Sequence, residues 1–315
     1  TRRSALRTAD QAQSAIDRYA RGASANELRA TGKELYYELL VAYRRIRYQE
    51  ENLRIMDVMK KLAEIRYPYN QGALGGVFKA EGRRYEAENM ILMTESEISS
   101  AKIALNALMN RSYGSALEID TTMEVRFTPV AQLDTGYLAV ARSDIRQMDQ
   151  SILAMRLNRD QMLQEAKPDF SIRYEHMSSR SPMMPKQYTL MGMISIPIAP
   201  WSSRMYRSEV KAMDFEVRAM RQEREAMLLN MAGMTRSMER ELLTMERQLK
   251  NYEAKILPAL NKNLKVTMLS YQENKADLPA VIDSWETVNM AQMNYLDQLS
   301  RFYKMIVAYE RAVQK

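Results

Sequence analysis

The chain has 315 residues, of which 27% are charged, only 10 are glycine, 9 are proline and none is cysteine. This composition is typical of long helices rather than of a compact α/β enzyme, and it excludes disulfides, thiolate metal sites and cysteine nucleophiles. The net charge of +7 is distributed over stretches in which Lys and Arg alternate with Asp and Glu, which does not favour a nucleic-acid partner.

Residues 1–109 are expected to form a first helical hairpin. Apolar residues recur at helical spacing from about residue 26, and no proline occurs before residue 67. The first helix should end at Tyr67–Pro68, because proline disfavours helical geometry in the residue before it. A tip over residues 67–78 then leads into a return helix over about 77–109.

Residues 110–129 break the helical pattern, and we expect a connector there with room for a short strand. Thr128 is a suitable N-cap for a helix over about 130–166, with Pro129 at its first helical position. This helix should end at Lys167–Pro168.

Residues 167–200 have the period-two alternation of a β-hairpin. Two interpretations are open: a strand pair of a transmembrane barrel, with lipid on one side and water on the other, or a hairpin covering a soluble core. In the first, lipid would contact the apolar residues of both arms, Phe170, Ile172, Tyr174, Leu190 and Ile194.

Residues 201–315 are expected to form a second helical hairpin. Its first helix is very long, and Pro258 predicts a kink in it. A tip over residues 271–283 leads to a last helix over about 279–313.

The two tips repeat one pattern. Tyr67, Asn70, Leu74 and Val77 match later residues without a gap, at a constant offset of 204 residues (271 minus 67). Their partners are Tyr271, Asn274, Leu278 and Val281. The repeat predicts two copies of one helix-pair unit.

With these motifs the chain resembles the TolC-like outer-membrane efflux proteins. The segment from Tyr271 to Asp283 is similar to the second helical tip of that family, which usually has Gly at the position of Asn274. Lys167–Phe170 resembles the start of the family's second barrel hairpin, and Ser195–Ile198 its end. The expected fold is therefore mainly α, with very long antiparallel helices in a coiled-coil bundle of helical hairpins, an internal repeat and one β-hairpin from a transmembrane barrel.

The resemblance implies an exit duct of a tripartite efflux system in the cell outer membrane, extending into the periplasm. It implies a homotrimer when full length, contact with outer-membrane lipid, and docking of the tips on a periplasmic adaptor and an inner-membrane pump. The docking residues would be the eight repeated tip residues, Tyr67, Asn70, Leu74, Val77, Tyr271, Asn274, Leu278 and Val281. Only one of the family's two barrel hairpins is present, so we expect the first helix and first hairpin to be missing from this chain.

Two acidic residues of the second tip have two possible roles. By the resemblance, Asp283 matches an aspartate that constricts the closed periplasmic entrance of the family, and Asp277 could substitute for a second one that is Ala280 here. The alternative is that Asp277 caps the last helix and Asp283 lies on a solvated face.

Methionine is unusually frequent, with 26 residues. Met213, Met220, Met227 and Met234 are spaced by seven, as expected for the packing positions of coiled coils. The alternative is binding of soft metal ions by thioethers, for which His176, Met177, Met183 and Met184 form the candidate site. Heavy-metal ions are accordingly the first candidate substrate, and drug-like molecules the second.

The sequence does not favour an enzyme, and it predicts no cofactor. It has one histidine, no cysteine and no Gly-rich phosphate loop, so no triad, zinc site or nucleotide site can be assembled from its motifs. The competing function is a soluble coiled-coil scaffold or adaptor without a transport role.

Overall fold

The computed structural model describes residues 2–69, 74–123, 125–165, 169–177, 187–195 and 200–314. The chain divides into two compact units, which we describe separately. The first consists of Thr1–Ser24 with Asp134–Ala232, and the second of Ala25–Leu133 with Gly233–Lys315. The fold is mainly helical with a single described β-hairpin, as the sequence predicts.

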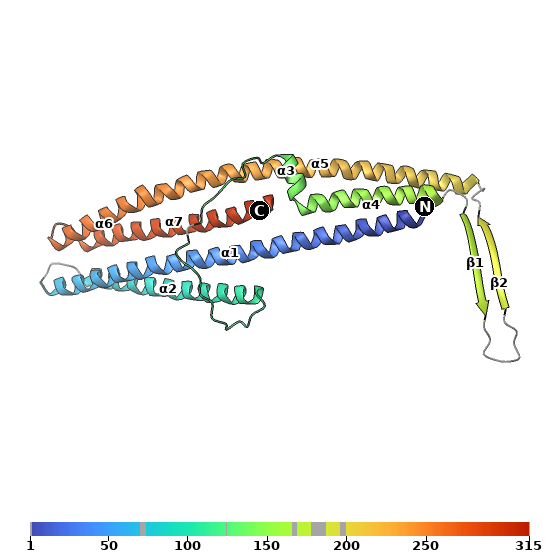
Figure 1. Ribbon diagram of the computed structural model, residues 1–315. Helices are drawn as coiled ribbons and strands as arrows, with labels where there is room; N and C mark the ends of the chain where they lie inside the picture. Colours follow the sequence, from blue (N-terminus) through green and yellow to red (C-terminus); the bar gives the residue numbers. More distant parts are fainter. Residues whose placement is uncertain are drawn as a thin grey trace, which may run out of the picture. The chain divides into compact units, whose positions relative to one another are not determined.

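Two of the helices are very long, and α1 continues from one unit into the other (Figure 1). With 65 residues it is about 100 Å long. None of the helices in the described ranges is long and apolar enough to cross a membrane. The elements in chain order are α1 Arg2–Arg66, the 3-10 turn η1 Tyr67–Tyr69, α2 Leu74–Leu108, α3 Thr135–Ala141, α4 Ser143–Glu165, β1 Asp169–Met177, β2 Gln187–Ser195, α5 Pro200–Asn251, the π-turn η2 Tyr252–Ile256, α6 Leu257–Gln272 and α7 Leu278–Val313.

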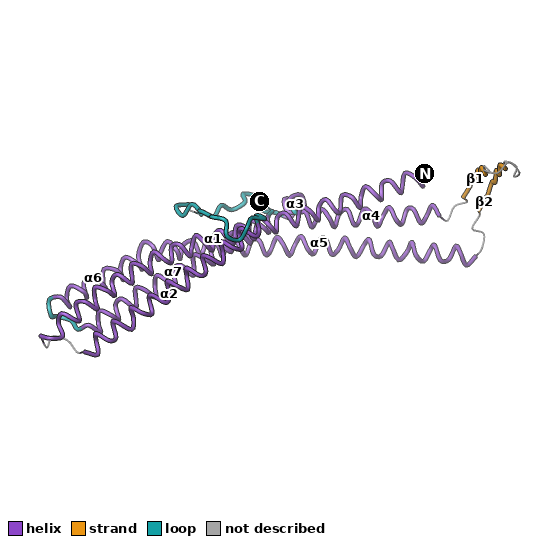
Figure 2. The backbone as a smooth tube through the Cα atoms, turned by 90° about the horizontal axis from the view of Figure 1, so that it is seen from below, coloured by secondary structure: helices purple, strands orange, loops and turns teal. Residues whose placement is uncertain are grey.

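In the second unit, α6 and α7 form one helical hairpin, and α2 with the later part of α1 forms the other (Figures 1 and 2). One apolar cluster joins all four helices near the tips, with Trp285 and Ile282 of α7 buried against Met59 of α1 and Ala80 of α2. A second cluster joins α1 and α2 through Leu39 and Leu105. The first cluster joins the two hairpins, and the second holds α1 and α2 together further from the tips.

The interface between α1 and α7 also carries a polar ladder. Glu38, Arg45 and Asn52 are spaced by seven residues on α1, so they lie on one face of the helix. Two of these residues form ion pairs with α7. Lys304 Nζ lies 2.7 Å from Glu38 Oε1, and Arg45 Nη2 lies 2.9 Å from Asp297 Oδ1. The Asn52 side-chain amide donates to the side-chain oxygens of Gln292 (2.7 Å) and Asn289 (3.2 Å). The ladder fixes which turn of α7 faces which turn of α1.

In the first unit, ion pairs join α4 to the early part of α5. Arg159 lies 2.8 Å from Asp214, and Arg224 lies 2.5 Å from Asp149. Six of the methionines spaced by seven on these helices are half-buried, which is consistent with a packing role, whereas Met234, the fourth of the α5 series, is exposed. The six are Met148, Met155 and Met162 of α4 and Met213, Met220 and Met227 of α5.

The π-turn η2 corrects a break in the heptad pattern. Leu242 and Leu249 are buried and seven residues apart, as are Leu257 and Leu264, whereas Leu249 and Leu257 are eight apart. A π-turn absorbs one extra residue, so it keeps all four side chains on the buried face. The interruption expected at Pro258 is therefore found directly before it, as one π-turn instead of a simple kink.

A buried tyrosine packs beside the π-turn. The Tyr295 hydroxyl of α7 donates to a carboxylate oxygen of Glu253 at 2.5 Å. Burial and this hydrogen bond raise the pKa of Tyr295 well above its ordinary value. The phenol consequently stays protonated and keeps its donor role at any physiological pH.

The expected helix over 130–166 begins later and consists of two helices. Thr128 and Pro129 do not begin it; α3 starts at Thr135, and Asp134 is the N-cap, accepting from the Tyr137 backbone N–H at 2.6 Å. Residues 125–130 are instead held on α7, where the Tyr309 hydroxyl accepts from the Val130 N–H. The described residues of 110–129 contain no strand.

Deletion of a single residue tests the role of the π-turn. Removing the exposed Ala254 would make the spacing from Leu249 to the next buried leucine seven, so we expect the π-turn to vanish and stability to change by no more than about 1 kcal/mol. Removing the exposed Lys265 would instead take Tyr271 off the buried face, and should cost about 3 kcal/mol or more. Thermal unfolding followed by circular dichroism measures both. Equal losses for the two deletions would contradict this role.

Candidate functional site

The hairpin β1–β2 has one apolar and one polar face. The strands pair antiparallel, with Phe170 opposite Ile194 and Tyr174 opposite Leu190. Because side chains alternate along a strand, these residues and Ile172 share a face. Ile172 is 82% and Leu190 74% exposed, so the apolar face is uncovered in the single chain. All five residues expected to contact lipid therefore lie on one exposed face.

The opposite face presents polar and sulfur-containing groups. Ser171 is opposite Met193, Arg173 opposite Met191, and Glu175 opposite Thr189. Arg173 also forms an ion pair with Glu175 at 3.0 Å. A hairpin with these two faces suits a boundary between an apolar and an aqueous medium.

Only part of the candidate metal site lies within the residues that the structure describes. His176 belongs to the apolar face, where its ring stacks on that of Tyr188 with centroids 4.5 Å apart. Met177 is the last residue of β1. Met183 and Met184 lie outside the described residues. The described part of the chain has no group of three or more His, Cys, Asp or Glu that could hold a metal ion.

The second tip is a Schellman turn followed by a capped helix. Asn274 has φ +59°, the left-handed conformation that asparagine adopts more easily than most residues. The Lys275 N–H donates to the Ser270 carbonyl at 2.8 Å, and the Asn274 N–H to that of Tyr271 at 3.1 Å. Asn274 thus fills the place for which glycine is the usual residue.

The two acidic residues of this tip differ in their surroundings. Asp277 is the N-cap of α7, and its carboxylate accepts from the Ala280 N–H at 3.2 Å. Asp283 is exposed, while its neighbours Ile282 and Ser284 are buried. Within the described residues, no side-chain partner of Asp283 is found. Both observations agree with the alternative role, in which Asp277 caps α7 and Asp283 lies on a solvated face.

The repeated tip residues occupy different environments. Tyr271 is 4% exposed and Tyr67 44%, although the two are equivalent in the repeat. Leu278 and Val281 are buried in the apolar cluster, to which Val77 contributes from its edge. Leu74 is exposed, and Asn70 lies outside the described residues. Three of the four repeated residues of the second tip are thus buried within the chain, whereas Tyr67 and Leu74 of the first tip are exposed.

Arg66 links the two tips and was not indicated by the sequence analysis. It is buried, its guanidinium lies 4.4 Å from the centroid of the Tyr271 ring, and it donates to the Gln272 carbonyl at 2.8 Å. Ser270 stands at the equivalent place of the second copy, so the repeat gives no signal for this contact. A cation over an aromatic face with a charge-assisted hydrogen bond is a directional link between the last turns of α1 and α6.

Comparison with known proteins shows the fold. No protein-family model and no curated protein sequence matches the chain. Among solved structures, it is similar to CusC, described as forming a transmembrane channel, with TM-score 0.84, 16% identity, and coverage of 99% of this chain and 74% of that one. It is also similar to the outer-membrane protein VceC of Vibrio cholerae, with TM-score 0.82, 17% identity, and coverage of 99% and 75%.

A third similar structure is the open state of the MtrE outer-membrane channel of Neisseria gonorrhoeae. The TM-score is 0.76 at 16% identity, with coverage of 98% of this chain and 71% of that one. The chain therefore has the TolC-like fold that its tip and hairpin motifs predict.

The link made by Arg66 can be tested at the second tip. We expect Arg66→Met, which keeps most of the aliphatic stem, to lower stability by about 2 kcal/mol through loss of the ring contact and the hydrogen bond. Hydrogen exchange at Lys275 and Ala276 should become faster, because their turn loses its support. The control is Arg301→Met, since Arg301 is exposed on α7. Unchanged exchange in the Arg66 variant would contradict the link.

Proposed function

We propose that this chain is the exit duct of a tripartite efflux system, passively conducting small solutes across the periplasm and the outer membrane. The observation that carries the proposal is the two-faced hairpin, because a face bearing Ile172 and Leu190 at high exposure requires an apolar surrounding. The fold shared with CusC, VceC and MtrE supports the same conclusion. The energy for transport would come from a partner pump.

The proposed working form is a homotrimer of the full-length protein in the outer membrane. An isolated two-stranded hairpin is at best marginally stable, so β1 and β2 require further strands to pair with. The tips would dock on a periplasmic adaptor and, through it, on an inner-membrane pump. Tyr67 and Leu74 are the exposed tip residues that support this docking.

The alternative is a coiled-coil scaffold without a transport role, in which the hairpin would cover a core. That role requires Phe170, Ile172 and Tyr174 to be buried, and all three are exposed. The channel is therefore the better interpretation of the hairpin. The similar structures CusC and MtrE are described as channels, which supports a function other than catalysis.

For the cargo, soft metal ions are the first candidate and drug-like molecules the second. Met191 and Met193 stand at alternate positions on the polar face of β2, where thioethers would meet a passing ion. Both are exposed, unlike Met213, Met220 and Met227 of α5.

The position of the hairpin in lipid is tested by a pair of adjacent substitutions. Ile172→Arg places a charge on the apolar face, at a cost of roughly 2–4 kcal/mol in each protomer near the bilayer midplane, so the full-length protein should no longer assemble in the outer membrane. Ser171→Arg adds the same side chain to the polar face and should assemble normally. Membrane fractionation with detection of the trimer measures both. Normal assembly of the Ile172 variant would refute the membrane assignment.

The gate role of Asp283 is tested by single-channel recording. Three copies of this carboxylate in a trimer would favour cations, and we expect Asp283→Asn to reduce the cation-to-anion permeability ratio several-fold at low ionic strength. Glu273→Gln is the matched control, because Lys275 lies 2.6 Å from Glu273 and offsets its charge. If the permeability ratio were the same in both variants, the proposed gate role of Asp283 would be wrong.

A further inference from the structure

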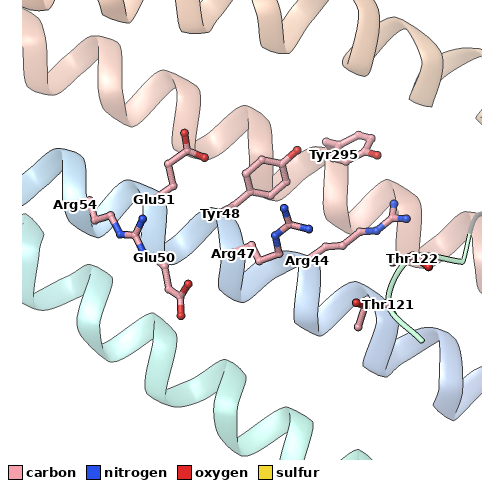
Figure 3. Close-up of a pocket in the computed structure, with 9 residues that line it drawn as sticks. All are labelled: Arg44, Arg47, Tyr48, Glu50, Glu51, Arg54, Thr121, Thr122 and Tyr295. Carbon is pink, nitrogen blue, oxygen red and sulfur yellow. The ribbon is translucent and has the colours of Figure 1, made fainter. Parts of the chain in front are cut away.

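A cavity of about 740 Å³ lies in the second unit between α1, the connector and α7 (Figure 3). Three arginines of α1, Arg44, Arg47 and Arg54, contribute to its wall. The connector supplies Thr121 and Thr122. The cavity is separate from the hairpin and from both tips, and nothing in the proposed export function uses it.

The three arginines lie along one side of α1. Positions 44, 47 and 54 differ by three and seven residues, which places the side chains on one face of the helix. At 1.5 Å per residue, Arg47 and Arg54 are separated by about 10 Å along the axis, and Arg44 and Arg47 by about 5 Å. The cavity therefore has a cationic end with two guanidinium groups and a second cationic point further along α1.

These three arginines differ in their ion pairing from Arg45, the next residue to Arg44 on the same helix. Arg45, next to Arg44, lies 3.1 Å from Glu97 and 2.9 Å from Asp297. In the described part of the chain, no carboxylate lies within ion-pair distance of Arg44, Arg47 or Arg54. Arg47 and Arg54 are exposed and Arg44 is half-buried, so their guanidinium groups are accessible to an anion from solution.

The wall opposite α1 is held in place and offers hydroxyl groups. The Thr122 hydroxyl and backbone N–H both donate to the Asp120 carboxylate, at 2.6 and 2.9 Å. The Asp120 carbonyl in turn accepts from the Tyr36 hydroxyl at 3.0 Å, which fixes the loop to α1. Thr121 of the connector and Tyr48 of α1 also line the cavity, and both side chains carry a hydroxyl.

Two glutamates restrict the kind of anion that fits. Glu50 and Glu51 also line the cavity, and their positions lie between Arg47 and Arg54 along α1. A ligand with continuous negative charge would meet these carboxylates and be repelled. A ligand with two anionic ends and a neutral middle would place each end at a guanidinium group. Its neutral middle would lie beside the glutamates, so their carboxylates would not repel it.

One residue that lines the cavity is hydrogen-bonded to the π-turn. Tyr295 lines the cavity, and its hydroxyl is bonded to Glu253 of that turn. Figure 3 shows the guanidinium groups of Arg44 and Arg47 beside the phenol rings of Tyr48 and Tyr295, with Arg54 further along α1.

We propose that the cavity binds an elongated molecule with two oxyanion groups about 10 Å apart, one at Arg44 and Arg47 and the other at Arg54. The hydroxyls of Thr121 and Tyr48 would complete the coordination of the first group. Guanidinium groups bind phosphate and carboxylate through paired hydrogen bonds, so both chemistries belong to this class. The bound molecule would brace the connector against α1 and α7.

Calorimetric titration of the detergent-solubilised full-length protein at about 0.15 M salt tests the proposal with four probes. They are inorganic phosphate, tripolyphosphate, 1,6-hexanediol bisphosphate and suberate. We expect the hexanediol bisphosphate to bind at least tenfold more tightly than phosphate and more tightly than tripolyphosphate, because only its charges are separated by a neutral spacer. Suberate, with carboxylates at a similar separation, distinguishes a carboxylate ligand from a phosphate ligand.

Substitutions then locate the two ends. Arg54→Gln should reduce the bisphosphate affinity to that of phosphate, and Arg44→Gln with Arg47→Gln should weaken every probe by about tenfold or more. The control is Lys262→Gln with Lys265→Gln, which removes the same charge from exposed positions of α6. Circular dichroism confirms that each variant is folded.

Two results would overturn the proposal. One is the absence of saturable binding of the bisphosphate and suberate to the unmutated protein. The other is an equal loss of affinity in the α1 variants and in the α6 control, which would show that only the overall charge of the protein matters.

Discussion

The packing of one face of α7 against three other helices is the constraint on which the second unit depends. Val281, Ile282, Trp285 and Val288 are all nearly inaccessible to solvent, and the cluster around them takes side chains from α1, α2 and α6. Burial of large apolar side chains is the main favourable term in such a bundle. Since the second tip leads directly into this face, the Schellman turn at Asn274 and the cap at Asp277 determine the direction in which α7 enters the cluster.

The heptad pattern explains why the other features occur where they do. A continuous seam along α5 and α6 requires one residue to be absorbed between Leu249 and Leu257, and the π-turn does so directly before Pro258. The turn places Glu253 at the Tyr295 hydroxyl, and Tyr295 forms part of the cavity beside Arg44. The extra residue in the heptad pattern therefore lies at the place where the buried phenol of Tyr295 borders the cavity with its arginines.

The sequence predicted most of the fold, because the signals concerned are local. Alternation over Asp169–Ser195 defined both strands and both faces, and Pro68 marked the end of α1 within two residues. The helix start at Thr135 was not predicted. Thr128 and Pro129 have the chemistry of a helix start, but contacts of Val130 and Phe127 with Tyr309 of α7 hold that segment in another conformation. Such contacts join residues about 180 positions apart and have no counterpart in a local pattern.

The site was predicted less completely, for a related reason. The repeat predicts the same role for Tyr67 and Tyr271, yet only Tyr271 is buried. Arg66 lies over the Tyr271 ring, and Tyr271 belongs to the apolar cluster that α7 shares with the other helices. Sequence similarity between two copies specifies the backbone turn, whereas burial depends on which element each copy contacts. The same reasoning applies to the hairpin. Its register places Phe170, Ile172 and Leu190 on one face, and no part of the described chain covers that face. The alternation predicts which residues share the face, but it does not specify what lies against them.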